Sequence, residues 1–218
     1  MATHPPAPAY DLERVSEAES RLFGTVRALD DTAMRATSLL PDWSVGHLLT
    51  HLARNADSHV RRTEASVEGV MVDQYPGGPS ERAAEIEAGA GRRAATIAED
   101  VAVSSARMLE AWAGVPDRAW SGVTRDASGL ERPLAQLPGR RWFEVEVHLV
   151  DLGTGPTHRD WSDAFVAARL PQMRDGLGAR LAEGATAPPA GTLDERDELA
   201  WLYGRFVRTD LPALGPWS

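Results

Sequence analysis

Apolar residues recur at helical spacing along much of this sequence, and no stretch shows a strand period of useful length. Between Asp11 and Leu29 the apolar residues fall three, four or seven positions apart, which places them on one face of a helix that Asp11 can cap. They are Leu12, Val15, Leu22, Val26 and Leu29. A helix with one apolar face has to bury it against other elements, so the sequence predicts a mainly α protein.

Three further long helices are expected in the first two thirds of the chain. Their ranges are 44–70, 80–113 and 138–153. Ser44 and Ser80 are suitable N-caps for the first two of these helices. Pro138 suits the first turn of the last one, and Gly153 suits its C-terminal cap. Together with the first helix, they predict a four-helix bundle, which we place in residues 1–154.

Glycine and proline mark the remaining segments. Gly89 and Gly91 interrupt the third expected helix at a cost of about 1 kcal/mol each, and they allow a kink or the close approach of another helix. Residues 114–133 are expected to be irregular or to form a short hairpin. Residues 155–218 are expected to form a small C-terminal helical region. Its helices are expected at 162–182 and 194–207, with a flexible connector at 184–191.

The chain carries a formal charge of -9, and its pI is near 5.2. A nucleic-acid surface needs clustered cations to neutralise phosphates, so this composition argues against nucleic-acid binding. No apolar run approaches the roughly 18 residues that span a bilayer, and the first residues lack the basic and apolar regions of a signal peptide. We therefore expect a cytoplasmic protein that binds neither nucleic acid nor a membrane.

The sequence contains no cysteine and no lysine. Without cysteine there is no disulfide, no iron–sulfur ligation and no internal thiol nucleophile. Without lysine there is no Schiff-base catalysis, no covalently bound pyridoxal phosphate and no P-loop lysine. Any metal must therefore be held by imidazole and carboxylate groups, and any thiol chemistry must use a thiol supplied from outside.

Histidine and glutamate recur at one-turn spacing on two of the expected helices. Glu144 and His148 are four residues apart, so both side chains lie on one helix face and can bind the same ion. His47 and His51 have the same spacing on the second helix, and spacing alone does not choose between them. Three protein ligands with a fourth position open are typical of catalytic zinc. The alternative is two ordinary surface pairs that are solvated or hydrogen-bonded.

Three polar residues near this pattern have candidate roles. Asp151, one turn after His148, can accept a hydrogen bond from the imidazole or can simply be a charge near the helix end. Asn55 is the only asparagine of the chain and lies one turn after His51. Its amide can hydrogen-bond either a ligand or a helix backbone. Glu146 falls on another face of its helix, and we expect it to lie in solvent.

Four segments resemble the mycothiol-dependent maleylpyruvate isomerase family, which belongs to the DinB-like helical metalloenzymes. In chain order they are WSVGHLLTHLARNAD, IEAGAGR, FEVEVHLVDLG and LAWLYGR. The resemblance implies a DinB-like four-helix bundle with a zinc ion, or another divalent metal, held by His51, Glu144 and His148. His47 is then a neighbour of the site. The last segment ends in Arg205, which matches a catalytic arginine of the family.

The resemblance also implies cis–trans isomerisation of maleylpyruvate to fumarylpyruvate, a step of gentisate degradation, with mycothiol as cofactor. The zinc-bound thiol would be deprotonated at neutral pH and would add reversibly to the electron-poor double bond. Charge passes into the neighbouring carbonyl, the new single bond rotates, and loss of the thiolate restores the double bond in the trans form. Arg205 would hold a substrate carboxylate, and Asn55 is the candidate cofactor-binding residue.

The sequence departs from the family in one respect and leaves other functions open. Family members carry a C-terminal domain with β-strands, whereas residues 155–218 look abbreviated. A mycothiol S-transferase acting on another electrophile would share the metal site. A zinc-dependent regulator is less favoured, because such proteins commonly use cysteine ligands. The expected partners are a small-molecule substrate and a low-molecular-weight thiol, in a monomer or homodimer.

Overall fold

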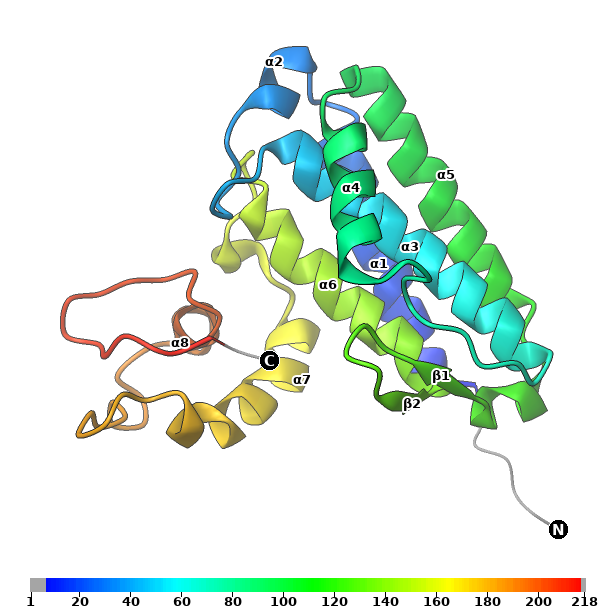
Figure 1. Ribbon diagram of the computed structural model, residues 1–218. Helices are drawn as coiled ribbons and strands as arrows, with labels where there is room; N and C mark the ends of the chain where they lie inside the picture. The colour runs from blue at the N-terminus through cyan, green and yellow to red at the C-terminus, as the bar shows by residue number, and fades with distance from the viewer. Residues whose placement is uncertain (1–6, 217–218) are drawn as a thin grey trace, which may run out of the picture. The chain divides into compact units, whose positions relative to one another are not determined.

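The computed structural model describes residues 7–216. The chain divides into two compact units, Met1–Thr154 and Gly155–Ser218. Helices dominate the first unit, whereas the second unit combines helices with long loops (Figure 1). Within the described residues, no helix is both long and apolar enough to cross a membrane.

Four long helices form the frame of the first unit (Figure 1). They are α1 (Ala9–Val26), α3 (Val45–Val67), α5 (Ala94–Ala113) and α6 (Leu137–Asp151). Helix α3 packs along α5, whereas α1 packs along α6 and also contacts α5. The mainly α fold and the four-helix bundle expected from the sequence are confirmed.

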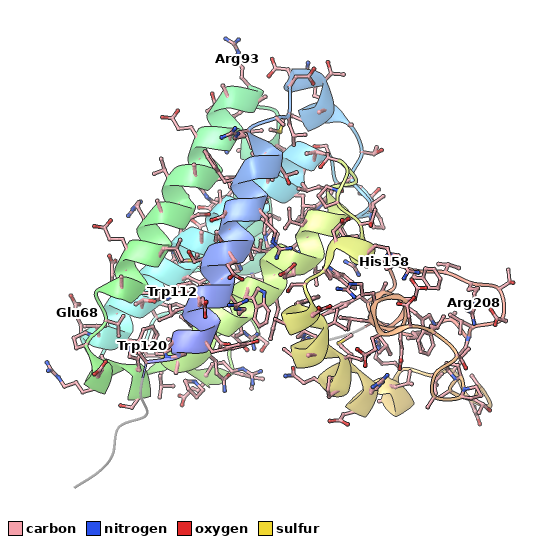
Figure 2. The ribbon with its side chains drawn as sticks, turned by 180° about the vertical axis from the view of Figure 1, so that it is seen from behind. Glu68, Arg93, Trp112, Trp120, His158 and Arg208 are labelled. Carbon is pink, nitrogen blue, oxygen red and sulfur yellow. The ribbon has the colours of Figure 1, made fainter. Side chains whose placement is uncertain are left out.

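The apolar stripes of these helices meet in a common core. Val15 of α1 and Leu52 of α3 are completely buried. Full burial of a side chain of this size stabilises the fold by about 1.5–3 kcal/mol. Figure 2 shows Trp112 and Trp120 at the end of the bundle opposite Arg93, and both tryptophans are buried. The core therefore runs the length of the bundle.

The first helix is displaced from its expected range of 11–29. It begins at Ala9, so Asp11 lies in the first turn and does not cap the helix. It ends early because a short helix that the sequence did not predict follows it, α2 (Asp31–Arg35). The Asp30 side chain caps α2 by accepting a backbone N–H at 2.8 Å.

The prediction of one long helix over residues 80–113 is wrong. This segment belongs to two helices, α4 (Gly78–Ala90) and α5, and the chain turns between them. Helix α4 packs closely on α3. At Gly89 only glycine fits, because a Cβ atom there would lie 2.4 Å from Cγ2 of Thr50. This packing places side chains of α4 against the face of α3 that carries the histidines.

Residues 114–133 contain a short hairpin, which is one of the two forms expected. Its antiparallel strands are β1 (Val123–Arg125) and β2 (Glu131–Pro133). In the turn, the Asp126 carboxylate accepts hydrogen bonds from two backbone N–H groups at 3.0 Å. Side chain–backbone hydrogen bonds therefore hold the turn, which is the usual role of aspartate there.

Among its described residues, the second unit contains two α-helices, α7 (Asp163–Asp175) and α8 (Glu195–Leu202). Both begin where the sequence predicts, because the side chains of Ser162 and Asp194 accept backbone N–H groups as N-caps. Both end earlier than expected, and Gly204, with φ of 74°, follows α8. The rings of Trp161, Phe165 and Tyr203 pack together in this unit.

Short 3-10 helices occur in both units. They lie at Asp117–Ser121, Leu134–Gln136, His158–Asp160 and Leu177–Ala179.

Candidate metal centre

Three side chains from two helices converge in the first unit. His51 lies on α3, and Glu144 and His148 lie one turn apart on α6. One ligand atom from each residue lies within 4.8 Å of the other two. Oε1 of Glu144 is 2.8 Å from Nε2 of His51 and 3.5 Å from Nε2 of His148. The structure thus brings together the three residues that the family resemblance implies as ligands.

His47, the other histidine of α3, lies at the start of the helix. Its Nδ1 atom accepts a hydrogen bond from the backbone N–H of Ser44 at 3.2 Å and completes a capping box. Its Nε2 atom is 3.1 Å from Oε2 of Glu87. Capping therefore occupies His47, and His51, one turn later, is the histidine of α3 that faces Glu144.

Asp151 orients His148. Its Oδ2 atom accepts a hydrogen bond from Nδ1 of His148 at 2.9 Å, and Asp151 is completely buried. This acceptor leaves Nε2 of His148 directed toward the cluster, as is usual for a histidine that binds a metal. Burial disfavours the protonated ring, but the hydrogen bonds to Asp151 and Glu144 outweigh it and raise the pKa of His148 to about 9. Burial also disfavours the Glu144 carboxylate, yet its hydrogen bonds to the two histidines hold its pKa well below the usual range.

His51 lies between Trp43 and Arg82. The Trp43 ring packs edge-on against the imidazole with a centroid separation of 5.5 Å. Nη2 of Arg82, on α4, lies 3.0 Å from Nδ1 of His51. Arginine can only donate, so Nδ1 is the acceptor and the ring proton lies on Nε2, toward Glu144. Burial lowers the pKa of His51, which keeps the ring neutral at pH 7.

Arg82 was not identified from the sequence. No helical spacing links it to His51, because the two residues lie on different helices. Its position depends on the break between α4 and α5 and on the close packing of α4 against α3. No signal in the sequence itself points to this contact.

The three side chains fit a divalent metal ion. Two imidazole nitrogens and one carboxylate oxygen are a donor set of catalytic zinc, which keeps its fourth position open. With metal–ligand distances of about 2.0–2.2 Å, tetrahedral ligand atoms lie about 3.4 Å apart. The 3.5 Å between Glu144 and His148 is close to this spacing, whereas the 2.8 Å between Glu144 and His51 is that of a hydrogen bond, which a bound metal would replace. The side chain of Glu144 is 31% exposed, so the cluster is accessible from solvent.

The expectation that Glu146 lies in solvent is wrong. Glu146 is 1% exposed, and its Oε1 atom accepts hydrogen bonds from Arg21 and from Nε1 of Trp142. Arg21 lies on α1, which covers this side of α6. Spacing along one helix shows which residues share a face, but it does not show whether another helix covers the other faces.

Asn55 is buried next to an arginine of the core. Its Oδ1 atom accepts a hydrogen bond from Nη1 of Arg141 at 2.8 Å, and the same nitrogen donates to the Leu52 carbonyl at 2.8 Å. The Asn55 side chain therefore pairs with another side chain, whereas the sequence predicted a hydrogen bond to a ligand or to a helix backbone. Its role in binding a cofactor stays a prediction.

Arg205 lies in the second unit, after α8 and next to Gly204. Its Nη1 atom donates a hydrogen bond to the carbonyl of Tyr203, and the Arg205 backbone N–H donates to the carbonyl of Ala200 at 2.7 Å. The second bond and the positive φ of Gly204 are the features of a helix C-terminal cap. The backbone around Arg205 is therefore defined by the end of α8.

The raised pKa of His148 makes the stability of the metal-free protein dependent on pH. The folded state binds this proton up to about pH 9, whereas an unfolded histidine loses it near pH 6.5. The protonated His148 therefore contributes fully to the free energy of unfolding below pH 6.5, and this contribution is lost as the pH rises to 9. The total loss is on the order of 3 kcal/mol. Urea unfolding of chelator-treated protein between pH 7 and 9 measures this loss. The variant His148→Gln should show a clearly flatter dependence, and equal slopes for both proteins would contradict the prediction.

A family model described as the mycothiol maleylpyruvate isomerase N-terminal domain matches residues 15–153. No curated protein sequence matches the chain significantly. Among solved structures, a histidine-to-alanine mutant of the mycothiol-dependent maleylpyruvate isomerase has a TM-score of 0.84 and 21% identity, covering 96% of this chain and 97% of that chain. Another crystal structure of the mycothiol-dependent maleylpyruvate isomerase has a TM-score of 0.79 and 22% identity, covering 95% of this chain and 92% of that chain. At these identities the likeness shows a shared fold.

The same comparison bears on the C-terminal region. Both solved chains are covered almost completely, so the present chain is not much shorter than either of them. Compared with these two structures, residues 155–218 are therefore not abbreviated, contrary to the expectation from the sequence. The region is small, and its helices are α7, α8 and two short 3-10 helices, joined by long irregular segments.

Proposed function

The chain belongs to the mycothiol maleylpyruvate isomerase N-terminal domain family, and on this premise we propose that it converts maleylpyruvate to fumarylpyruvate with mycothiol as cofactor. The observation that carries the proposal is the convergence of His51, Glu144 and His148 on one point. The absence of cysteine supports the need for an external thiol. An isomerisation leaves the atoms of the substrate unchanged, so it requires neither a hydride donor nor a hydrolytic water.

In this proposal, His51, Glu144 and His148 hold a zinc ion or another divalent metal. When bound, such an ion supplies the positive charge that lowers the pKa of an added thiol, so that a thiolate is present at neutral pH. Asp151 retains the Nδ1 proton of His148 and so keeps Nε2 available as a ligand. Trp43 packs against the His51 ring and limits its rotation. The exposed side of Glu144 leaves an approach for the thiol and the substrate.

The proposal is tested with purified zinc-loaded protein in two parallel assays. In the first, isomerisation of maleylpyruvate is followed with and without mycothiol, and we expect turnover only when the thiol is present. In the second, mycothiol is supplied with the generic electrophile 1-chloro-2,4-dinitrobenzene. Conjugation without any isomerisation would overturn the isomerase proposal in favour of a mycothiol S-transferase.

Arg205→Ala is expected to retain zinc and to lower kcat/KM for maleylpyruvate by about 10- to 100-fold. The reason is the loss of charge-assisted hydrogen bonds to a substrate carboxylate, worth about 1.5–3 kcal/mol. Steady-state kinetics and elemental analysis measure the two effects. Arg208→Ala is the matched control, because Arg208 lies nearby in sequence and pairs with Asp210 at the surface. Kinetics of Arg205→Ala equal to those of the control would disprove the carboxylate role.

A further inference from the structure

Arg82 brings a guanidinium group to the edge of the metal cluster. It extends from α4 and contacts Nδ1 of His51 at 3.0 Å. Its guanidinium carbon also lies 5.3 Å from the centre of the Tyr75 ring. Stacking of this kind attracts the cation and restricts where the side chain can go. Arg82 is therefore a positioned cation that directly contacts one of the three candidate ligands.

Arg82 has no acidic partner in the described part of the chain. By contrast, Arg92 and Arg54 both pair with Asp100 at 2.6 Å. The contact of Arg82 with a neutral imidazole does not neutralise its charge. An arginine that is oriented but not neutralised can bind an anion with both arms of its guanidinium.

Metal binding by His51 would release Arg82 from its present contact. A neutral imidazole that binds a metal through Nε2 carries its proton on Nδ1. Arginine has donors only, so Nδ1–H and the guanidinium cannot hydrogen-bond to each other. Arg82 would then lie beside the loaded site with its donors directed to another acceptor, while the Tyr75 ring still supports it.

We propose that Arg82 binds a carboxylate of the substrate beside the loaded metal site. This role rests on the proposed function, and it makes Arg82 a substrate-binding residue of the first unit. Arg82 contacts the substrate in this proposal and takes no proton from it. A carboxylate is the anion whose geometry matches the guanidinium fork, and the ring of Tyr75 leaves little entropy to lose on binding.

The test measures binding of maleate, a simple cis-dicarboxylate, to the zinc-loaded protein by titration calorimetry. We expect Arg82→Gln to weaken maleate binding by about 10- to 100-fold, and Arg82→Lys to restore part of the loss, because it keeps the charge without the fork. Arg92→Gln is the matched control, because Arg92 follows α4 and pairs with Asp100. The control should bind maleate like the wild type.

Zinc affinity provides a second readout that separates substrate binding from support of His51. Because Arg82 holds the imidazole in the tautomer that does not bind the metal, Arg82→Gln should bind zinc at least as tightly as the wild type. Weaker zinc binding in this variant would overturn the proposal and make Arg82 a residue that only supports His51. Unchanged maleate binding would also overturn it, because the metal alone would then hold the dianion.

Failure of the role proposed for Arg82 can be distinguished from failure of the proposed isomerase activity. If the wild type binds maleate through Arg82 but does not isomerise maleylpyruvate, the carboxylate site stands and the proposed reaction fails. If the wild type isomerises maleylpyruvate and Arg82→Gln has an unchanged KM and unchanged maleate binding, the proposed reaction stands and the role of Arg82 fails.

Discussion

Replacement of His51 by alanine is expected to abolish both metal binding and isomerase activity. His51 supplies the candidate ligand from α3, while Glu144 and His148 come from the same helix, α6. Without His51 the ion would have two protein ligands, whereas catalytic zinc sites use three. Loss of a group that merely orients a ligand costs about 10- to 100-fold in metal affinity, so loss of the ligand itself should exceed that.

Elemental analysis after dialysis and the mycothiol-dependent assay measure the two effects of this substitution. The matched control is His47→Ala, because His47 lies one turn earlier on the same helix and serves its capping box. The control should retain stoichiometric metal and most of the activity, with a stability loss of about 1 kcal/mol from the weakened cap. A His51→Ala protein that retains stoichiometric zinc would refute the ligand assignment.

Replacement of Glu19 by alanine is expected to destabilise the first unit by about 3–5 kcal/mol. Arg141 is completely buried, and its Nε atom donates to Oε1 of Glu19 at 2.6 Å. Oε2 of Glu19 accepts a hydrogen bond from Ser105 at 2.8 Å. Removing the carboxylate leaves a charged guanidinium in the core with only neutral partners, Asn55 and the Leu52 carbonyl. Leaving one member of a buried ion pair uncompensated has a cost of this size.

Urea unfolding followed by circular dichroism measures the change in the free energy of unfolding for Glu19→Ala. The matched control is Glu17→Ala on the same helix, where the side chain is 54% exposed and pairs with Arg14. An exposed pair contributes about 0–1 kcal/mol, so the control should scarcely change stability. The double variant Glu19→Ala, Arg141→Met should recover part of the loss, because it removes the unpaired charge. A loss below about 1 kcal/mol for Glu19→Ala alone would show that Arg141 is compensated in another way.

Helix capping and apolar periodicity explain why much of the fold could be predicted. Both signals are local, since a cap joins a side chain to a backbone N–H two or three residues away. Ser44, Ser162 and Asp194 act as N-caps at the expected positions. Gly153 has a φ of 66° just after α6, which suits the expected helix end.

The errors arise where contacts between distant segments override these local signals. The expected third helix runs through Gly91, but the chain turns there and forms α4, which packs on α3. Glu146 was placed in solvent because its spacing from Glu144 shows only that it lies on another face. Helix α1 covers that face, and Arg21 contacts the carboxylate there.

The ligand candidates show the same division. The pair of Glu144 and His148 follows from spacing on one helix. The choice of His51 over His47 came from the family resemblance, and the structure gives its physical basis, since Ser44 engages His47 in capping. Asp151 was one of two alternatives, and its hydrogen bond to His148 supports the orienting role.

The sequence by itself determined that the protein is mainly helical, that it has no thiol or lysine nucleophile of its own, and that its histidine and glutamate pairs lie on two helices. Only the tertiary structure decided that His51 meets Glu144 from 93 positions away and that Arg82 reaches His51 from another helix. The physical reason is that periodicity and capping act over one helical turn. The cluster instead depends on how α3, α4 and α6 pack, and this depends on the shapes of side chains that are distant in sequence.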